Sequence, residues 1–411
     1  MASAGLRANR NFLLLWSGHA LSQLGFHGVR IAYPLLVLTL TGSPAAAGWV
    51  GFAIAAPSLI FQIPAGVVAD YGDRIRILVR CQLVGLAATG LVAAAIYARL
   101  PGLVVIAVAA AFVEGCVNVF VGVSELAAVR DVVAPEQRPA AFSFLEAEQP
   151  IAALFGRAAG ATVYGVARWL PFVANAVSYV VCLITLMLIR QVSGTPSAAD
   201  RTARPSTARS IADGLRTAWS DRFLRASTTM IAASNAVIQV VLLLIMVELA
   251  ASGYSAWIIG LVLGSAGLGG ILGAAGAARL IARFPIRLVY RVALWVWTAL
   301  LVPIALSTNP FVLAACWAGI GGIGVVSNVA LTVYRVEVIP EQILGRAVAA
   351  MGLFCNAAVA LGALGAGYLL STLGIVVTRW GALAAMLALA ICAGTSIVAH
   401  RSATPAPVSA P

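Results

Sequence analysis

The sequence contains no lysine, and only 10% of its residues are charged, so it lacks most of the groups that keep a soluble protein in water. Apolar residues occupy 62% of its 411 positions, and the mean hydropathy is +1.00. Soluble globular domains are roughly 45–50% apolar and about 25% charged. The composition excludes an ordinary soluble protein and predicts a chain that crosses a membrane many times.

The sequence also lacks the motifs of common catalytic and metal sites. It has no HExxH, no nucleophile elbow and no phosphate-binding GxxxxGK. Its six cysteines are scattered through apolar stretches without CxxC spacing. His19 and His27 would lie about 12 Å apart on a helix, too far to share one metal ion. We therefore expect no enzyme, no cofactor and no metal site.

Long apolar runs separated by charges or turn residues dominate what is present. A bilayer crossing needs about 20 helical residues, and the runs are too long for barrel strands. This predicts an all-α polytopic membrane protein with twelve transmembrane helices, at residues 12–39, 45–69, 76–98, 102–127, 140–166, 170–190, 223–250, 255–281, 287–307, 310–334, 344–372 and 375–398.

Arginine is distributed unevenly between the loops. Arg99, Arg168 and Arg379 lie in one alternating set, whereas the other set and both termini hold the remaining arginines outside the spans. By the positive-inside rule both termini should be cytoplasmic. The exclusive use of arginine, with abundant alanine and glycine, suggests a GC-rich bacterial genome. The expected location is therefore a bacterial plasma membrane. Attraction to anionic lipid accounts for the net charge of +12 without a nucleic-acid partner.

The two halves of the chain repeat each other. RDVVAPEQRPAA near residue 130 and RVEVIPEQILGRA near residue 335 place the shared PEQ 205 residues apart, which indicates six helices plus six helices. A polar stretch between them reads as a linker with a short amphipathic helix. The expected domains are two six-helix bundles at 1–190 and 222–400, a cytoplasmic linker at 191–221 and a tail at 401–411.

The stretch GVVADYGDRIRIL at 66–78 resembles the loop signature of the major facilitator superfamily between its second and third helices. NRNFLLLWSGHALSQLG, PLLVLTLTGSPAAAGWVGF and the PEQ segments resemble the macrolide-efflux and enterobactin-exporter branch of its drug:proton antiporters. The resemblance implies two bundles that rock around a central cavity and expose it alternately to each side of the membrane.

The loop signature predicts a cytoplasmic gate made of Gly66, Asp70, Gly72, Arg74 and Asp131. The Asp70 carboxylate can accept hydrogen bonds from an opposing helix N-terminus, which by analogy is that of the eleventh helix. Gly72 permits a tight reversal, and Arg74 can pair with Asp131. A solvated turn with positive-inside arginines is the alternative. The corresponding stretch of the second half has no acid, so the gate would be one-sided.

Polar residues inside the spans identify a candidate substrate cavity, because a buried charge costs about 2.5–3.5 kcal/mol unless it faces a cavity or a partner. Intervals of three, four and seven place residues of the first and fourth helices on single stripes, and the resemblance makes both helices cavity-lining. The candidates are His19, Gln23, His27, Arg30, Glu114, Asn118, Arg157, Asn235, Gln239, Asn328 and Asn356.

Three residues are candidates for proton coupling: Glu114, His27 and Glu146. Glu114 is the first choice, since a carboxyl group in a dry cavity can be neutralised by a proton. His19 could carry the proton instead. A permanent ion pair between Arg30 and Glu114 is the structural alternative. Branch members often carry an acid where this chain has Phe26, which moves the expected role away from that position.

In the fifth helix the antiporter pattern GPxxG is replaced by Gly156-Arg157-Ala158-Ala159-Gly160. Its glycines would permit close contact between the bundles. Arg157 shares a stripe with Glu146, whereas Glu148 points to the opposite face. Arg157 either binds an anionic group of the substrate or is paired internally, and the sequence leaves both open.

These observations predict a secondary active transporter, most simply a proton-coupled exporter of an amphipathic small organic molecule such as an antibiotic, drug or siderophore. Such a protein confers multidrug resistance, has protons and membrane lipid as further partners, and is expected to work as a monomer. Uptake or lipid flipping by the same fold, or a sensor or scaffold role, are the alternatives.

Overall fold

The computed structural model describes residues 6, 9–189, 221–339 and 341–398, and their regular structure is helical throughout. The first half of the chain comprises α1 (Arg10–Thr41), α2 (Pro44–Ala55), α3 (Pro57–Tyr71), α4 (Arg74–Tyr97), α5 (Leu103–Val132), the short 3₁₀ helix η2 (Pro135–Gln137), α6 (Arg138–Val166) and α7 (Leu170–Met187). The second half comprises α9 (Arg222–Ala251), α10 (Ala256–Arg283), α11 (Ile286–Leu306), α12 (Pro310–Val338) and α13 (Glu341–Val398).

Twelve membrane-spanning segments are present among the described residues, as the sequence predicts. Ten helical segments are long and apolar enough to cross a membrane when α2 with α3, and the whole of α13, are each taken as one. Gly374 divides α13 into two spans, because its φ of 75° and ψ of 176° are not helical. In α6 the apolar part is shorter, running from Ile151 to Val166, because the first half of this helix carries polar residues.

Side-chain caps fix where many of the spans begin. Asn9, Ser43, Asp73, Asp221 and Asn309 each accept a hydrogen bond from a backbone N–H in the first turn of the following helix. Such a cap satisfies a donor that the helix itself cannot pair. The short polar stretches between the apolar runs therefore determine where these helices start. The predicted amphipathic helix of the linker lies outside the described residues.

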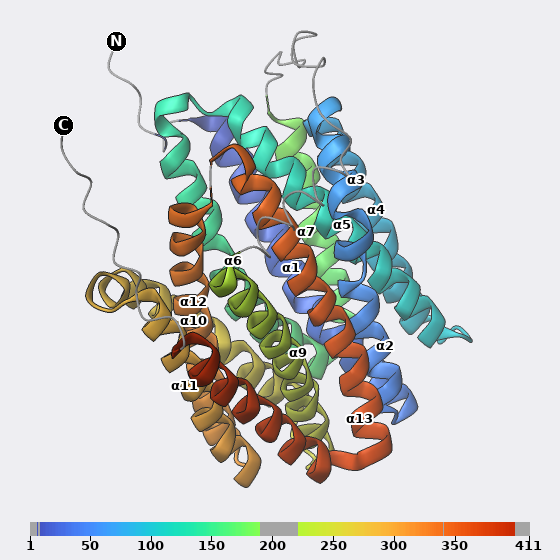
Figure 1. The fold of residues 1–411 in the computed structure, drawn as a ribbon. Coiled ribbons are helices and arrows are strands. Elements are labelled where there is room, and N and C mark those ends of the chain that lie inside the picture. The colour runs from blue at the N-terminus through green and yellow to red at the C-terminus, as the bar shows by residue number, and fades with distance from the viewer. Residues whose placement is uncertain (1–5, 7–8, 190–220, 340, 399–411) are drawn as a thin grey trace, which may run out of the picture.

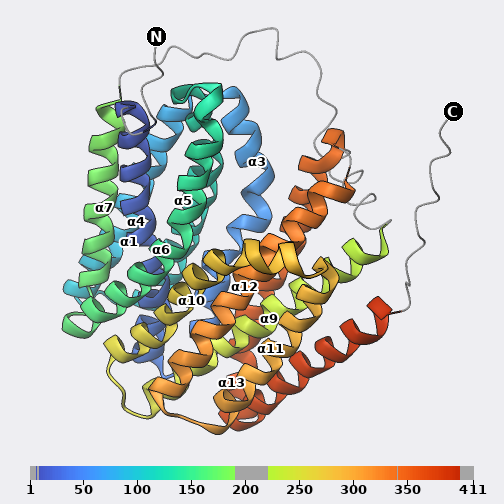
Figure 2. The ribbon, with the colours of Figure 1, turned by 90° about the vertical axis from the view of Figure 1, so that its left-hand side faces the viewer.

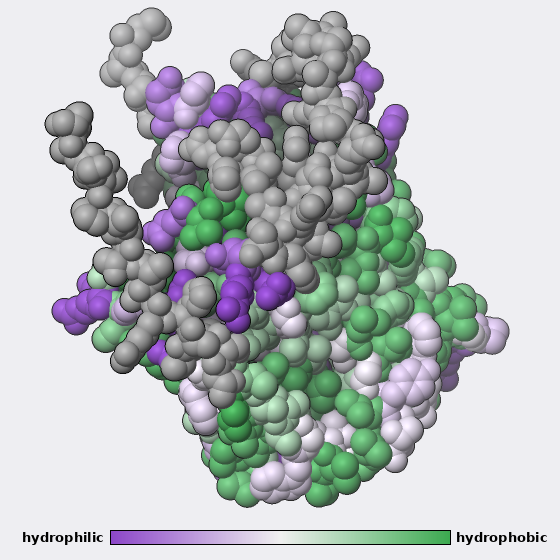
Figure 3. Space-filling model, in the orientation of Figure 1, coloured by the Kyte–Doolittle hydropathy of each residue, from purple (hydrophilic) through white to green (hydrophobic). Residues whose placement is uncertain are grey.

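The spans form two six-helix bundles, α1 to α7 and α9 to α13 (Figures 1 and 2). We call the end where α1 and α9 begin the basic end, and the opposite end the hairpin end. Figure 2 shows the bundles close together at the hairpin end and diverging toward the basic end. In Figure 3 hydrophilic residues gather toward the basic end, and the remainder of the visible face is mostly apolar, as a lipid-facing surface should be.

Small residues let the bundles approach each other closely along α6 and α10. A Cβ atom added at Gly260 would lie 2.1 Å from Cβ of Ala161, and one at Gly267 would lie 2.5 Å from Cβ of Leu154. The glycine-rich α10 therefore packs directly against α6. The second seam joins α2 to α13, where a Cβ atom on Gly48 would lie 2.8 Å from Cα of Gly367.

The glycines of α6 have a different role from the predicted one. Gly156 and Gly160 do not contact the other bundle; they face α1, where a Cβ atom at Gly160 would lie 2.4 Å from Cα of Gly28. The prediction was wrong because both faces of α6 carry small residues, and periodicity alone does not say which neighbour each face meets. The glycine face packs inside the first bundle, and the alanine face meets α10.

Candidate functional site

A cavity of about 410 Å³ lies between the bundles. It is lined by α1, α2, α3, α5 and α6 of the first bundle and by α13 of the second. Its polar lining includes five of the predicted cavity residues, His19, Gln23, Arg30, Asn118 and Asn356. The stripe prediction for the first and fourth spans therefore identifies much of the real lining.

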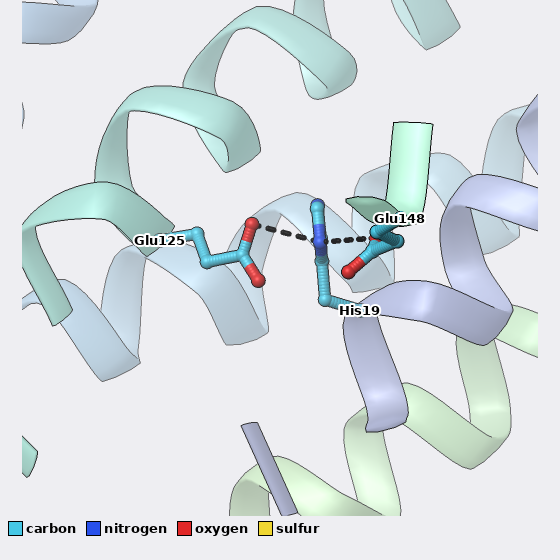
Figure 4. A group of neighbouring side chains, drawn as sticks. All are labelled: His19, Glu125 and Glu148. Carbon is cyan, nitrogen blue, oxygen red and sulfur yellow. Dashed lines mark ion pairs between the residues drawn. The ribbon is translucent and has the colours of Figure 1, made fainter. Parts of the chain in front are cut away.

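Three buried side chains from three helices meet at one side of this cavity (Figure 4). Nδ1 of His19 in α1 lies 2.7 Å from Oε2 of Glu125 in α5 and 2.9 Å from Oε1 of Glu148 in α6. Their side chains are only 4–8% exposed. We call these three residues the His19 cluster.

Hydrogen bonding assigns the hydrogen of the imidazole. The amide nitrogen of Gln23 lies 3.0 Å from Nε2 of His19 and 3.3 Å from Oδ1 of Asn118. An amide nitrogen only donates, so in this orientation Nε2 accepts and the hydrogen of a neutral His19 sits on Nδ1, between the two carboxylates. One N–H then serves two carboxylates.

The His19 cluster has more negative than positive charge available. Even with a doubly protonated imidazole, two ionised carboxylates leave a net charge of −1. No arginine among the described residues forms an ion pair with Glu125 or Glu148. A buried unpaired charge is strongly unfavourable, so the cluster requires a further proton or a cation.

The three side chains could also hold a metal ion. Each offers one ligand atom, and these atoms lie within 4.8 Å of one another. The prediction of no metal site rested on His19 and His27 and on the cysteine spacing, and it did not include carboxylates from other helices. Glu148 was set aside because it points away from Arg157, yet in α6 that opposite direction is the one that faces α1 and α5.

Glu114 lies elsewhere, inside the first bundle. Its carboxylate accepts hydrogen bonds from Nδ2 of Asn175, at 3.1 Å to each oxygen, and from the hydroxyl of Tyr179 at 2.7 Å. The side chain is fully buried and does not line the cavity. The ion pair with Arg30, which was the structural alternative, is absent from the described structure, and α7 supplies neutral donors instead.

Arg30 and Arg157 line a second, smaller cavity of about 60 Å³ together with Gln239 of α9. Arg30 and Ile54 also line the larger cavity, so the two are adjacent. The guanidinium of Arg30 lies 5.8 Å from the ring centre of Phe26. Two further predicted cavity residues, Arg157 and Gln239, are thereby accounted for.

The remaining predicted cavity residues line neither cavity. His27 is buried in α1 and lies against α6 at Gly156. Asn235 is half-buried, and Asn328 is exposed on α12. Glu146 lies among the residues of α6 whose side chains are not described, so its predicted role stays open. Helical periodicity places a residue on a face but does not decide what that face meets.

The gate motif forms the contact expected inside the first bundle. Nη1 of Arg74 donates to both carboxylate oxygens of Asp131 at 2.5 Å, and Nε donates to the carbonyl of Ala69 at 3.2 Å. The expected contact of Asp70 with the start of α13 stays a prediction, because most side chains in the first turns of α13 are not described.

The two glycines of the motif differ in their surroundings. A Cβ atom at Gly72 would lie 2.8 Å from the carbonyl oxygen of Val68, so space and not a left-handed φ requires glycine there. A Cβ atom at Gly66 would meet nothing within 4 Å.

One buried ion pair was not predicted. Arg379 in the second half of α13 pairs with Glu248 near the end of α9. Both residues stood out in the sequence, one as a rare arginine of the poorly charged loops and the other as an acid in an apolar span. Their wide separation along the chain gave no signal that they meet. The pair holds the hairpin end of the second bundle together.

Comparison with known proteins agrees with this architecture. Residues 15–326 match the sequence model of the family described as Major Facilitator Superfamily. No curated protein matches the chain significantly by sequence.

Several solved structures share the fold at low identity. A point mutant of the nucleoside transporter NupG has a TM-score of 0.71 and 14% identity over 94% of this chain and 99% of its own. A bacterial homologue of the iron transporter ferroportin in an inward-facing state gives 0.69 and 17% over 96% and 99%. A bacterial homologue of the human lysosomal transporter Spinster, inward-facing and unoccupied, gives 0.67 and 14% over 98% and 100%.

Proposed function

The chain belongs to the major facilitator superfamily, and on that premise we propose that it exports an amphipathic small organic molecule in exchange for protons. The solute classes suggested by its likeness to the macrolide-efflux and enterobactin-exporter branch are antibiotics, drugs and siderophores. Uptake of a solute, or flipping of a lipid, by the same fold is the alternative function.

The proposal places the basic end in the cytoplasm of a bacterial cell, as the arginine distribution predicts. The cavity then lies toward the inner side of the membrane, since its lining includes Leu126 near the end of α5 and Leu145 near the start of α6, and Figure 2 shows the bundles diverging toward that end. Nε1 of Trp49 donates to the hydroxyl of Tyr368 at 3.1 Å across that joined end. The pair of Arg74 with Asp131 would belong to the gate that closes the basic end in the opposite state.

The His19 cluster carries the proposal of proton coupling. It borders the cavity, it is buried, and it needs one more positive charge than its own residues provide. Protonation supplies that charge, and release of the proton restores the imbalance. A rocking transporter can use such a site if each side of the membrane meets it in turn. Glu114 is second to it, because neutral donors already satisfy its carboxylate.

Proton release from everted membrane vesicles tests this assignment. We expect macrolide, catecholate or lipophilic-cation solutes, added one at a time, to trigger proton release through the wild type. Replacing Glu148 by Gln removes one carboxylate and with it the extra charge, so the triggered release should fall about tenfold or more, equivalent to at least ~1.4 kcal/mol in the rate-limiting step.

Glu136→Gln is the matched control, since Glu136 is exposed in η2 and should leave the release unchanged. Equal proton release from wild type and Glu148→Gln, with both proteins present in the membrane, would show that the cluster does not couple. Absence of release with every solute would argue against proton exchange altogether.

Transport of a divalent cation is a second candidate, favoured by the ligand atoms within 4.8 Å in the His19 cluster. One imidazole nitrogen and two carboxylate oxygens suit ions such as Mn²⁺ or Fe²⁺. One of the structural relatives is described as a homologue of an iron transporter. Adding Mn²⁺ to the same vesicles separates the two functions: uptake of Mn²⁺ that is lost in Glu148→Gln would favour this candidate over export of an organic solute.

A further inference from the structure

We propose that Arg30 and Arg157 form a binding site for the anionic head of the transported solute, a carboxylate or a phosphate. This inference rests on the proposed transport of a small organic molecule and names its chemical class. The two guanidinium groups come from α1 and α6 and line the same cavity of about 60 Å³.

The two arginines lack a counter-charge in the part of the chain that the structure describes. Among the described residues, no carboxylate forms an ion pair with Arg30 or Arg157, and no carbonyl accepts a hydrogen bond from either. Arg379, by contrast, does have a carboxylate partner, Glu248. Two neighbouring positive charges inside a membrane-spanning bundle are unfavourable unless an anion joins them.

The two cavities suit a solute that has a small charged head and a larger body. The small cavity has room for a carboxylate or phosphate group, which arginine recognises through paired N–H donors. Apart from Gln239 its remaining lining is apolar or glycine. The adjacent cavity of about 410 Å³ shares Arg30 and Ile54 with it and can take the body of the molecule. An amphipathic organic anion fits this pair of spaces.

The small cavity lies where the bundles join, with Arg30 and Arg157 on one side and Gln239, Leu243 and Ala363 on the other. An anion bound there touches both bundles, so its binding energy depends on how they are oriented. Only such differential binding can shift the equilibrium between two states. Occupancy of this site would therefore also shift the equilibrium between the two orientations of the bundles.

A set of probes with one aromatic body and different charges tests the proposal. The full chain in lipid nanodiscs is titrated with 1-naphthoate, 1-naphthyl phosphate, neutral 1-naphthamide and 1-naphthylmethylammonium, and binding is followed by calorimetry. We expect at least one anion to bind, and to bind about 10- to 100-fold more weakly to Arg157→Gln, because charge-assisted hydrogen bonds are lost. Arg283→Gln is the control, since Arg283 is exposed at the end of α10.

The thermal stability of the empty protein gives an independent readout. If Arg157 faces an uncompensated positive neighbour, Arg157→Gln should raise the melting temperature by about 2 °C. A lower melting temperature would mean that Arg157 has an internal partner, and would overturn the proposal. Failure of both anions to bind the wild type, or equal binding of the charged and neutral probes, would overturn it as well.

The outcomes separate this inference from the proposed proton coupling. Proton release triggered by a neutral or cationic solute, with no binding of either anion, would overturn the anion site and leave proton exchange standing. Binding of an anion that is lost in Arg157→Gln, without proton release in vesicles, would support the anion site and argue against proton exchange.

Discussion

The buried charged residues of this transporter differ in the partners that balance their charge. Glu248 has an arginine, Glu114 has neutral hydrogen-bond donors, and the His19 cluster has one imidazole for two carboxylates. Arg30 and Arg157 have no acid among the described residues. The sites that remain unbalanced border the two cavities. Imbalance of charge, more than polarity alone, therefore marks the residues that should act on solutes and protons.

Glu114 should be a stability residue. Because its carboxylate joins α5 to Asn175 and Tyr179 of α7, Glu114→Ala should lower the free energy of unfolding by about 1–3 kcal/mol as buried donors lose their acceptor. Thermal unfolding in detergent measures this. Solute-triggered proton release per folded molecule should stay at the wild-type level. Loss of release from a variant of normal stability would instead restore Glu114 as the coupling acid.

At the scale of one element, α10 depends on glycine only where another helix touches it. A Cβ atom at Gly269 would lie 1.7 Å from the carbonyl oxygen of Ala318 in α12, whereas one at Gly276 would meet nothing within 4 Å. Both glycines are in the same helix and differ in their neighbours alone. They therefore form a matched pair for testing the helix packing.

Gly269→Ala should destabilise the protein by about 1–3 kcal/mol, because α10 and α12 must move apart. Gly276→Ala should be neutral or stabilising by up to about 1 kcal/mol, since alanine favours the helix. Melting temperatures of the two variants check this prediction. Equal destabilisation would indicate that the loss of glycine itself, and not contact with α12, is responsible.

At the scale of the whole molecule, transport by rocking requires the hairpin end to open. A Cβ atom at Gly51 would lie 3.2 Å from Cβ of Ala363 in the other bundle, close to the spacing of about 3.5–4.5 Å found in disulfides. A Gly51→Cys, Ala363→Cys double variant should therefore cross-link the bundles on oxidation and lose solute-triggered proton release. Reduction should restore it.

Each single cysteine variant is the control for this experiment, since it can form no such bridge. Because Gly51 and Ala363 line the small cavity, the proton release of each single variant before oxidation is the reference, and oxidation should not lower it further. Mass spectrometry of the digested protein confirms the cross-link. Continued transport by the fully cross-linked protein would mean that the bundles do not separate at this end.

The sequence by itself determined the fold class and the number of spans. Apolar runs must become helices in lipid, where backbone groups have no water to bind, and the polar caps between them fix the helix starts. Periodicity along α1 and α5 also found His19, Gln23, Arg30 and Asn118 of the cavity lining, because residues three and four apart share a helix face.

Only the tertiary structure decided which faces meet. It placed Glu148 beside His19 and Glu125, and it gave Glu114 partners in α7 and not Arg30, the alternative that the sequence had left open. It also turned the glycines of α6 toward α1. The physical reason is that periodicity records the direction of a side chain relative to its own helix, whereas a partner is chosen by the position and rotation of every other helix in the bundle.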